Sequence, residues 1–125
     1  MFKEEGIGWS LSVDASNETF PVHIGGECTS TEITKEEWQA LVPIVIDLID
    51  QFERYNYNFV SDESIILQIN KGFWSVFVEG FKDEWALKIS LTGESLKSRG
   101  FNMYWPIPSA KDFVSAMRLM WDSYQ

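Results

Sequence analysis

The sequence contains very little cysteine and histidine. Cys28 and His23 are the only residues of their types among 125. A single thiol cannot form an internal disulfide, so we expect a reducing, cytoplasmic environment. A metal site needs several well-spaced ligands, which one histidine and one cysteine do not supply. We therefore expect no metal and no other cofactor.

The same two residues are a weak basis for catalysis, although a histidine base and a thiol nucleophile can form an active site. His23 is predicted on the outward face of a strand, and Cys28 follows the glycine pair Gly25-Gly26 as a small filler. We predict that the protein is not an enzyme, and a small-ligand enzyme is the last of the alternatives.

Long apolar runs are also missing. The longest, Leu41 to Ile46, stops at Asp47, whereas about 20 apolar residues are needed to span a bilayer. No apolar stretch typical of a signal peptide follows Met1. We therefore expect a cytoplasmic protein without a membrane segment.

Basic residues are scarce, with ten Lys and Arg against nineteen Asp and Glu and a net charge of -9. This balance argues against a general duplex-DNA binder, because phosphate attraction needs a cationic surface. Residues 1–62 hold three basic and twelve acidic side chains, whereas residues 63–125 hold seven of each. The acidic first half is therefore a candidate surface for a basic protein, and the neutral second half leaves nucleic acid open as a partner.

Apolar residues, in contrast, are abundant. They make up 45% of the chain, and aromatic residues make up 15%, including six tryptophans. This content excludes disorder, because burying it offsets the entropy lost on ordering the chain. A length of 125 residues fits a single domain that spans residues 1–125.

Alternating apolar and polar residues predict strands, and two capped amphipathic stretches predict helices. The first helix follows Thr34, which forms a capping box with Glu37, and runs to about Tyr55. The second helix follows Ser109 and runs to about Tyr124. Predicted strands are residues 9–13, 20–24 and 27–30 before the first helix, and 65–69, 73–79, 84–91 and 101–105 before the second. The fold class is therefore α+β, with antiparallel sheet and the order strands, helix, strands, helix.

Both predicted helices carry apolar arcs wider than contact with one sheet requires. We expect them to pack on sheet and also on each other, on a partner subunit, or on both, which leaves a homodimer as one alternative. A shift of 75 positions places Thr34 on Ser109 and Trp38 on Phe113. Residues 1–60 and 61–125 are therefore candidate half-repeats with a pseudo-two-fold relation. The competing explanation is that any capped amphipathic helix offers such matches.

The strands of the second half carry the one arrangement with functional content. If Trp74 and Trp85 point inward, then the other face is shared by Phe73, Ser75, Phe77 and Lys88. Exposed aromatics beside cations bind single strands through base stacking and phosphate attraction. The candidate binding face consists of Phe73, Phe77, Lys88, Lys97 and Arg99. The alternative is that a helix or a second subunit covers the two phenylalanines.

A framework of glycine and tryptophan motifs runs through nearly the whole chain. It comprises Glu5-Gly6-Ile7-Gly8-Trp9, Ile24-Gly25-Gly26-Glu27, Glu37-Trp38, Glu79-Gly80, Trp85-Ala86-Leu87, Arg99-Gly100-Phe101 and Trp105-Pro106. This framework resembles a small cyanobacterial family of unknown function. The resemblance implies a fold similar to that of Whirly/PC4-type single-stranded-DNA-binding transcriptional regulators, with sheets and packed helices related by true or pseudo two-fold symmetry. It carries over no functional residues, because a fold hosts many activities.

The leading hypothesis is a non-enzymatic binding or regulatory module that binds single-stranded nucleic acid through the second-half strand face. The alternative is a protein-interaction or assembly module whose acidic first half meets a basic partner. Neither the patterns nor the resemblance identifies the physiological partner.

Overall fold

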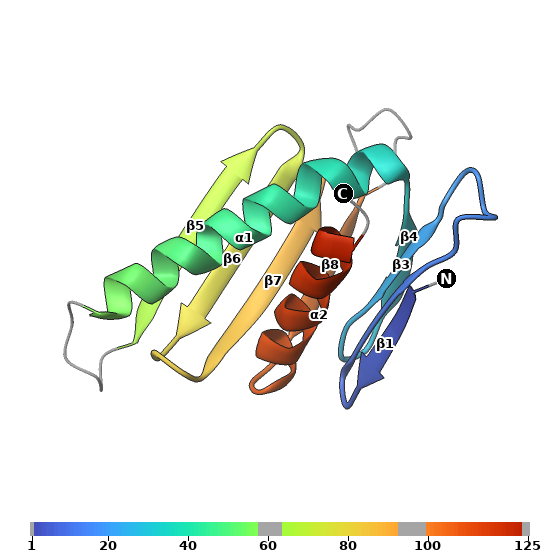
Figure 1. Ribbon diagram of the computed structural model, residues 1–125. Helices are drawn as coiled ribbons and strands as arrows, with labels where there is room; N and C mark the ends of the chain where they lie inside the picture. Colours follow the sequence, from blue (N-terminus) through green and yellow to red (C-terminus); the bar gives the residue numbers. More distant parts are fainter. Residues whose placement is uncertain (1, 58–63, 93–99, 124–125) are drawn as a thin grey trace.

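The computed structural model describes residues 2–57, 64–92 and 100–123, and it contains two four-stranded antiparallel sheets and two helices (Figure 1). The first half comprises β1 (Phe2–Gly6), β2 (Trp9–Val13), β3 (Val22–Gly25), β4 (Ser30–Ile33) and α1 (Lys35–Tyr57). The second half comprises β5 (Ile65–Lys71), β6 (Trp74–Gly80), β7 (Trp85–Leu91), β8 (Phe101–Trp105) and α2 (Ser109–Ser123). Within each sheet the spatial order of the strands follows the chain. The predicted α+β class and the order of elements are confirmed.

Two strands of the first sheet differ from the prediction. β1 was not predicted, because four of its five residues are exposed and no apolar alternation marks it. The predicted strand 27–30 was wrong: β4 begins at Ser30, and the Gly26 N–H donates to the Thr29 carbonyl in a tight turn (2.8 Å). Both strands lie at edges of the sheet, where a strand needs few buried side chains.

The start of α1 follows the predicted capping box. The Glu37 N–H donates to Thr34 Oγ1 (3.1 Å), and the Thr34 N–H donates to Glu37 Oε1 (2.8 Å). These bonds satisfy two backbone donors that have no acceptor inside the helix. Ile33 and Trp38 flank the cap and are both buried, so the helix starts directly after β4.

Each helix covers the sheet of the other half. α1 follows the first sheet but packs on β5 and β6, whereas α2 follows the second sheet but packs on β1 and β2 as well as on β7 and β8. The helices also contact each other, and in Figure 1 both lie in front of the second sheet, with the first sheet to the right of α2. This exchange explains the wide apolar arcs, because each helix has a sheet and a second helix to contact.

The halves join at Trp105, the last residue of β8. Its side chain is fully buried and stacks on Phe113 of α2, with ring centroids 4.2 Å apart and an interplanar angle of 10°. Its indole N–H donates to the carbonyl of Gly25 in β3 (2.8 Å). Nearby, the Glu27 N–H donates to the carbonyl of Tyr104 (3.2 Å). The edge of the second sheet is therefore bonded to the end of β3 in the first sheet.

The connection between β2 and β3 is held by polar turns, as the sequence indicates. The Asp14 carboxylate accepts hydrogen bonds from the side chain (2.6 Å) and backbone N–H (3.0 Å) of Ser16. These bonds lower the pKa of Asp14 below its usual 3.8 because they stabilise the charged form. The side-chain oxygen of Asn17 accepts from the backbone of Thr19 (3.1 Å) and Phe20 (2.9 Å), an arrangement typical of Asx turns.

Neither α1 nor α2, over the residues described, is long and apolar enough to cross a membrane.

Replacing Trp105 by Phe tests the joint between the halves. The variant keeps an aromatic ring against Phe113 but leaves the buried Gly25 carbonyl without its donor. We expect a loss of about 1–3 kcal/mol in the free energy of unfolding from the unpaired carbonyl, measured by urea denaturation.

Trp74→Phe is the matched control, because Trp74 is buried and its indole N–H makes no hydrogen bond within the described part of the chain. The difference between the two variants isolates the hydrogen bond. Equal destabilisation by both substitutions would contradict a special role for Trp105.

Candidate functional site

The outward face of the second sheet carries a row of side chains that includes two aromatic rings. Cross-strand pairing places Gln68 of β5, Phe77 of β6, Lys88 of β7 and Tyr104 of β8 directly beside one another. We call these four residues the aromatic row. Directly opposite residues on one face have Cβ atoms about 4.5–5.5 Å apart, so the lysine lies between the two rings.

The aromatic row faces away from the helices. Its neighbours along the strands, such as Val76, Leu87 and Met103, point to the other face and are buried against α1 and α2. Phe77 is partly buried, Lys88 is exposed, and the side chain of Tyr104 is 48% exposed. Neither described helix therefore covers Phe77, contrary to one of the alternatives left open by the sequence.

A second row of uncharged polar residues runs parallel to the first. It consists of Asn70, Ser75, Ser90 and Asn102, which cross-strand pairing places in line. Gln68 Nε2 donates to Ser75 Oγ (2.9 Å) and to Asn70 Oδ1 (3.1 Å), and Ser90 Oγ donates to Asn102 Oδ1 (2.6 Å). These bonds hold the polar side chains in place on the sheet. We call this set the polar row.

On the other side of the aromatic row lies a hollow of about 340 Å³. Pairing places the small side chain of Ala86 beside Glu79, which leaves space above the sheet. The walls include Phe81 in the β6–β7 turn and Ile107 after β8. Phe77, Lys88 and Tyr104 of the aromatic row also line the hollow, together with Glu79.

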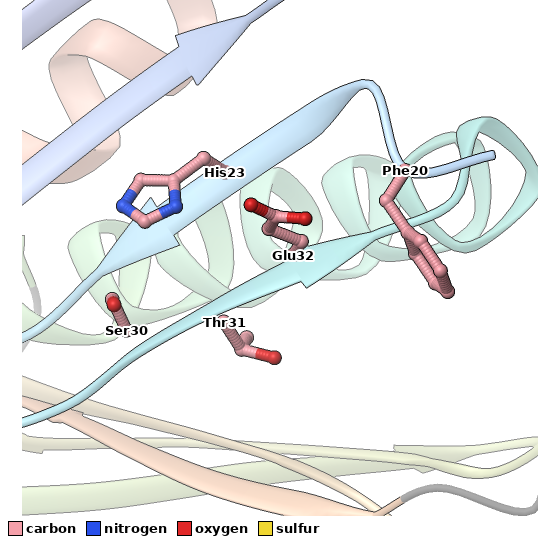
Figure 2. A pocket seen from close by; sticks show the side chains of 5 residues that line it. All are labelled: Phe20, His23, Ser30, Thr31 and Glu32. Carbon is pink, nitrogen blue, oxygen red and sulfur yellow. The ribbon is translucent and has the colours of Figure 1, made fainter. Parts of the chain in front are cut away.

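The outward face of the first sheet offers a comparison within the same molecule. Its central row is Lys3, Ser12, His23 and Glu32. Figure 2 shows His23 on β3 and Glu32 on β4 beside a shallow groove of about 390 Å³, with Phe20 set apart before β3. No strand residue on the outward face of β1–β4 is a phenylalanine, tyrosine or tryptophan. The two outward faces therefore differ in chemistry although the sheets share one architecture.

His23 and Cys28 lie in separate elements. His23 is within β3, and Cys28 is exposed in the connection that follows. Across residues 2–57, 64–92 and 100–123, no three His, Cys, Asp or Glu side chains are grouped so that they could hold a metal ion.

A further cavity of about 450 Å³ lies where the end of β2 meets both helices. Its apolar part is formed by Trp38, Met120 and Trp121, and Glu18 and Lys35 stand among its polar residues. We assign no function to this cavity.

The structure brings together part of the predicted binding face. Phe77 and Lys88 are neighbours on the outward face. Phe73 is exposed in the turn between β5 and β6, one residue before the strand in which it was predicted. Lys97 and Arg99 lie outside the described residues.

Tyr104 was missed by sequence reasoning. The pattern of residues 101–105 already showed that Phe101, Met103 and Trp105 alternate with it, so its outward direction could have been read. Its position beside Lys88 could not be predicted from the sequence, because this position depends on the register between β7 and β8.

Fold and site together define an α+β domain of two exchanged strand-helix halves, with an aromatic row on one outward sheet face. Residues 4–120 match a family model described as "Domain of unknown function (DUF1818)". The chain belongs to this DUF1818 family.

A solved structure shares this fold. The chain is 37% identical to a protein of unknown function from Prochlorococcus sp. NATL2A, described as a member of the DUF155 family. The TM-score is 0.90, and the match covers 98% of this chain and 100% of that one. No match was found among curated proteins. The expected family of unknown function is confirmed, whereas the similarity to Whirly/PC4-type regulators stays a prediction.

Proposed function

We propose that the protein is a non-enzymatic module that binds single-stranded nucleic acid on the outward face of its second sheet. The observation that supports this most directly is the aromatic row, in which Lys88 stands between Phe77 and Tyr104. Base stacking on such rings contributes about 1–3 kcal/mol per base. The Lys88 ammonium group, which lies between the two stacking positions, can pair with the phosphate that links two stacked nucleotides.

The charge of the face favours stacking over phosphate attraction as the main source of affinity. Along the outward face of β5–β8 the charged residues are Glu79 and Lys88, which cancel. A duplex offers its phosphates and hides the faces of its bases, so such a surface gains little from it. A single strand exposes those faces, and the polar row adds hydroxyl and amide groups beside them.

The contrast between the two sheets supports the same choice. The outward face of the first sheet shows that this architecture tolerates serine, histidine and glutamate at its exposed positions. Aromatic residues on the second sheet are therefore not required by the fold. Their exposure has a cost in water that a ligand would remove.

A second copy of the chain or another protein is the competing occupant of this face. The centre of a stable homodimer interface is more apolar than ordinary surface, whereas here the polar row lies directly beside the two rings. The alternative module, in which the acidic first half meets a basic protein, uses the other sheet. It has one favourable observation, the exposed acidic edge strand β1 with Glu4 and Glu5.

Alanine substitutions in the aromatic row test the proposal. We expect Phe77→Ala and Tyr104→Ala each to weaken binding of a labelled oligothymidylate by about 5- to 150-fold, because each removes one stacking surface. Tyr104→Phe keeps the ring and should bind nearly as the parent does. Fluorescence anisotropy at low and moderate salt gives the dissociation constants.

Leu119→Ala is the control for this series, since Leu119 is an exposed apolar residue on α2, away from the second sheet's outward face. A parent protein that binds no single strand at micromolar concentration would overturn the proposal. Retention of full affinity in both alanine variants would show that binding occurs elsewhere.

The salt dependence of binding tests the role of Lys88. For single strands the logarithm of the binding constant falls with the logarithm of salt concentration by about 0.7 per phosphate contact. We expect a shallow slope for the parent. The slope of Lys88→Gln should be smaller in magnitude by about 0.7, because one phosphate contact is lost. Lys3→Gln makes the same change on the outward face of the first sheet and should leave the slope unchanged.

A further inference from the structure

We propose that the hollow beside the aromatic row is a pocket for one guanine base, read by the carboxylate of Glu79. This inference rests on the proposed binding of single strands and adds base selectivity to it. The hollow combines aromatic walls from Phe77, Phe81 and Tyr104 with one acidic group, Glu79, and one basic group, Lys88.

The size of the hollow suits a single base. Ala86 has the smallest side chain on the outward face of β7, and it lies beside Glu79 in the cross-strand pairing. Phe81 and Ile107 stand around this gap, and both are more than 40% exposed. The volume of about 340 Å³ falls at the small end of ligand pockets, which span about 300–1,000 Å³.

Hydrogen-bond chemistry selects the base. An ionised carboxylate is an acceptor only and can pair with two parallel donors at once. On the edge that a single strand exposes, guanine offers two adjacent donors, its ring N1–H and its exocyclic amino group. Adenine and cytosine place an acceptor nitrogen beside their amino group, and thymine and uracil flank one N–H with two carbonyls. Guanine is therefore the base that satisfies both oxygens of Glu79 without a repulsive contact.

The other groups of the hollow complete a nucleotide site. Rings at Phe77, Phe81 and Tyr104 provide stacking surface, and a purine has the larger face to stack. Lys88 lines the hollow and also lies within the aromatic row. Its ammonium group therefore pairs with the phosphate between the guanine and the next base. Glu79 and Lys88 thus have complementary partners on one ligand.

The test uses oligothymidylate strands that carry a single guanine, adenine, cytosine or inosine at the centre. Good base-edge pairs discriminate by about 5- to 150-fold, and we expect the guanine strand to bind more tightly than the adenine and cytosine strands within this range. Inosine differs from guanosine only by the missing exocyclic amino group, so the affinity of its strand should fall between that of the guanine strand and those of the adenine and cytosine strands. Fluorescence anisotropy with the full chain measures all four.

Two variants assign the preference to the hollow. Glu79→Gln exchanges one acceptor oxygen for a donor and should abolish the preference for guanine over inosine. Ala86→Met fills the hollow and should abolish selectivity, while binding to the aromatic row persists. Glu32→Gln and Ser12→Met make similar changes on the outward face of the first sheet and should leave the preference intact.

The possible results distinguish failure of the guanine pocket from failure of single-strand binding. Strands that bind with equal affinity whatever the central base would overturn the guanine pocket and leave single-strand binding standing. A guanine preference that survives both Glu79→Gln and Ala86→Met would also overturn it. Guanosine monophosphate that binds the parent but not Ala86→Met, with no oligonucleotide binding, would support the pocket and overturn the strand-binding proposal. Absence of binding by every strand and by the nucleotide would overturn both.

Discussion

The hydrogen bond from the buried indole of Trp105 to the carbonyl of Gly25 holds the two halves in one arrangement. A buried carbonyl without a donor is costly. This bond therefore restricts movement of the end of β8 relative to the end of β3. The same indole stacks on Phe113 and thereby ties α2 to the joint. Tyr104 is the neighbour of Trp105 in β8, and its carbonyl accepts from Glu27. The candidate site thus begins one residue from the joint, on a strand fixed by both sheets.

Exchange of the helices has a consequence for where function can reside. Because α1 covers β5 and β6 while α2 covers β1 and β2, both helices lie on the inward side and leave two outward sheet faces available. The faces share strand order and pairing, yet the second carries a phenylalanine and a tyrosine where the first carries neither. Because the two sheets share one architecture and differ in their exposed side chains, a site on either face is determined by those side chains and not by the fold.

Strands could be predicted from the sequence where one buried face makes apolar and polar residues alternate, and they were missed where no face is buried. β6 and β7 alternate strictly between buried and less buried residues, so their inward tryptophans could be predicted. β1 contributes only Phe2 to the core, and no periodic signal marks it. The candidate site was half predicted for a related reason. Phe77 and Lys88 lie on strands joined by a short hairpin, whereas the place of Tyr104 depends on a pairing with β7 that the local pattern does not encode.

The net charge of -9 argues against a general duplex-DNA binder, but it does not exclude binding of a single strand at the second sheet. Charge repels a strand mainly where it stands within a Debye length of the phosphates, about 8 Å at physiological ionic strength. Seven acidic and seven basic residues lie in positions 63–125, and on the outward face of β5–β8 Glu79 and Lys88 balance. The acidic first half therefore limits long-range attraction without preventing contact at the aromatic row. A binder built in this way depends on stacking and on the Watson–Crick edges of the bases, and it gains little from a duplex, where other bases occupy both.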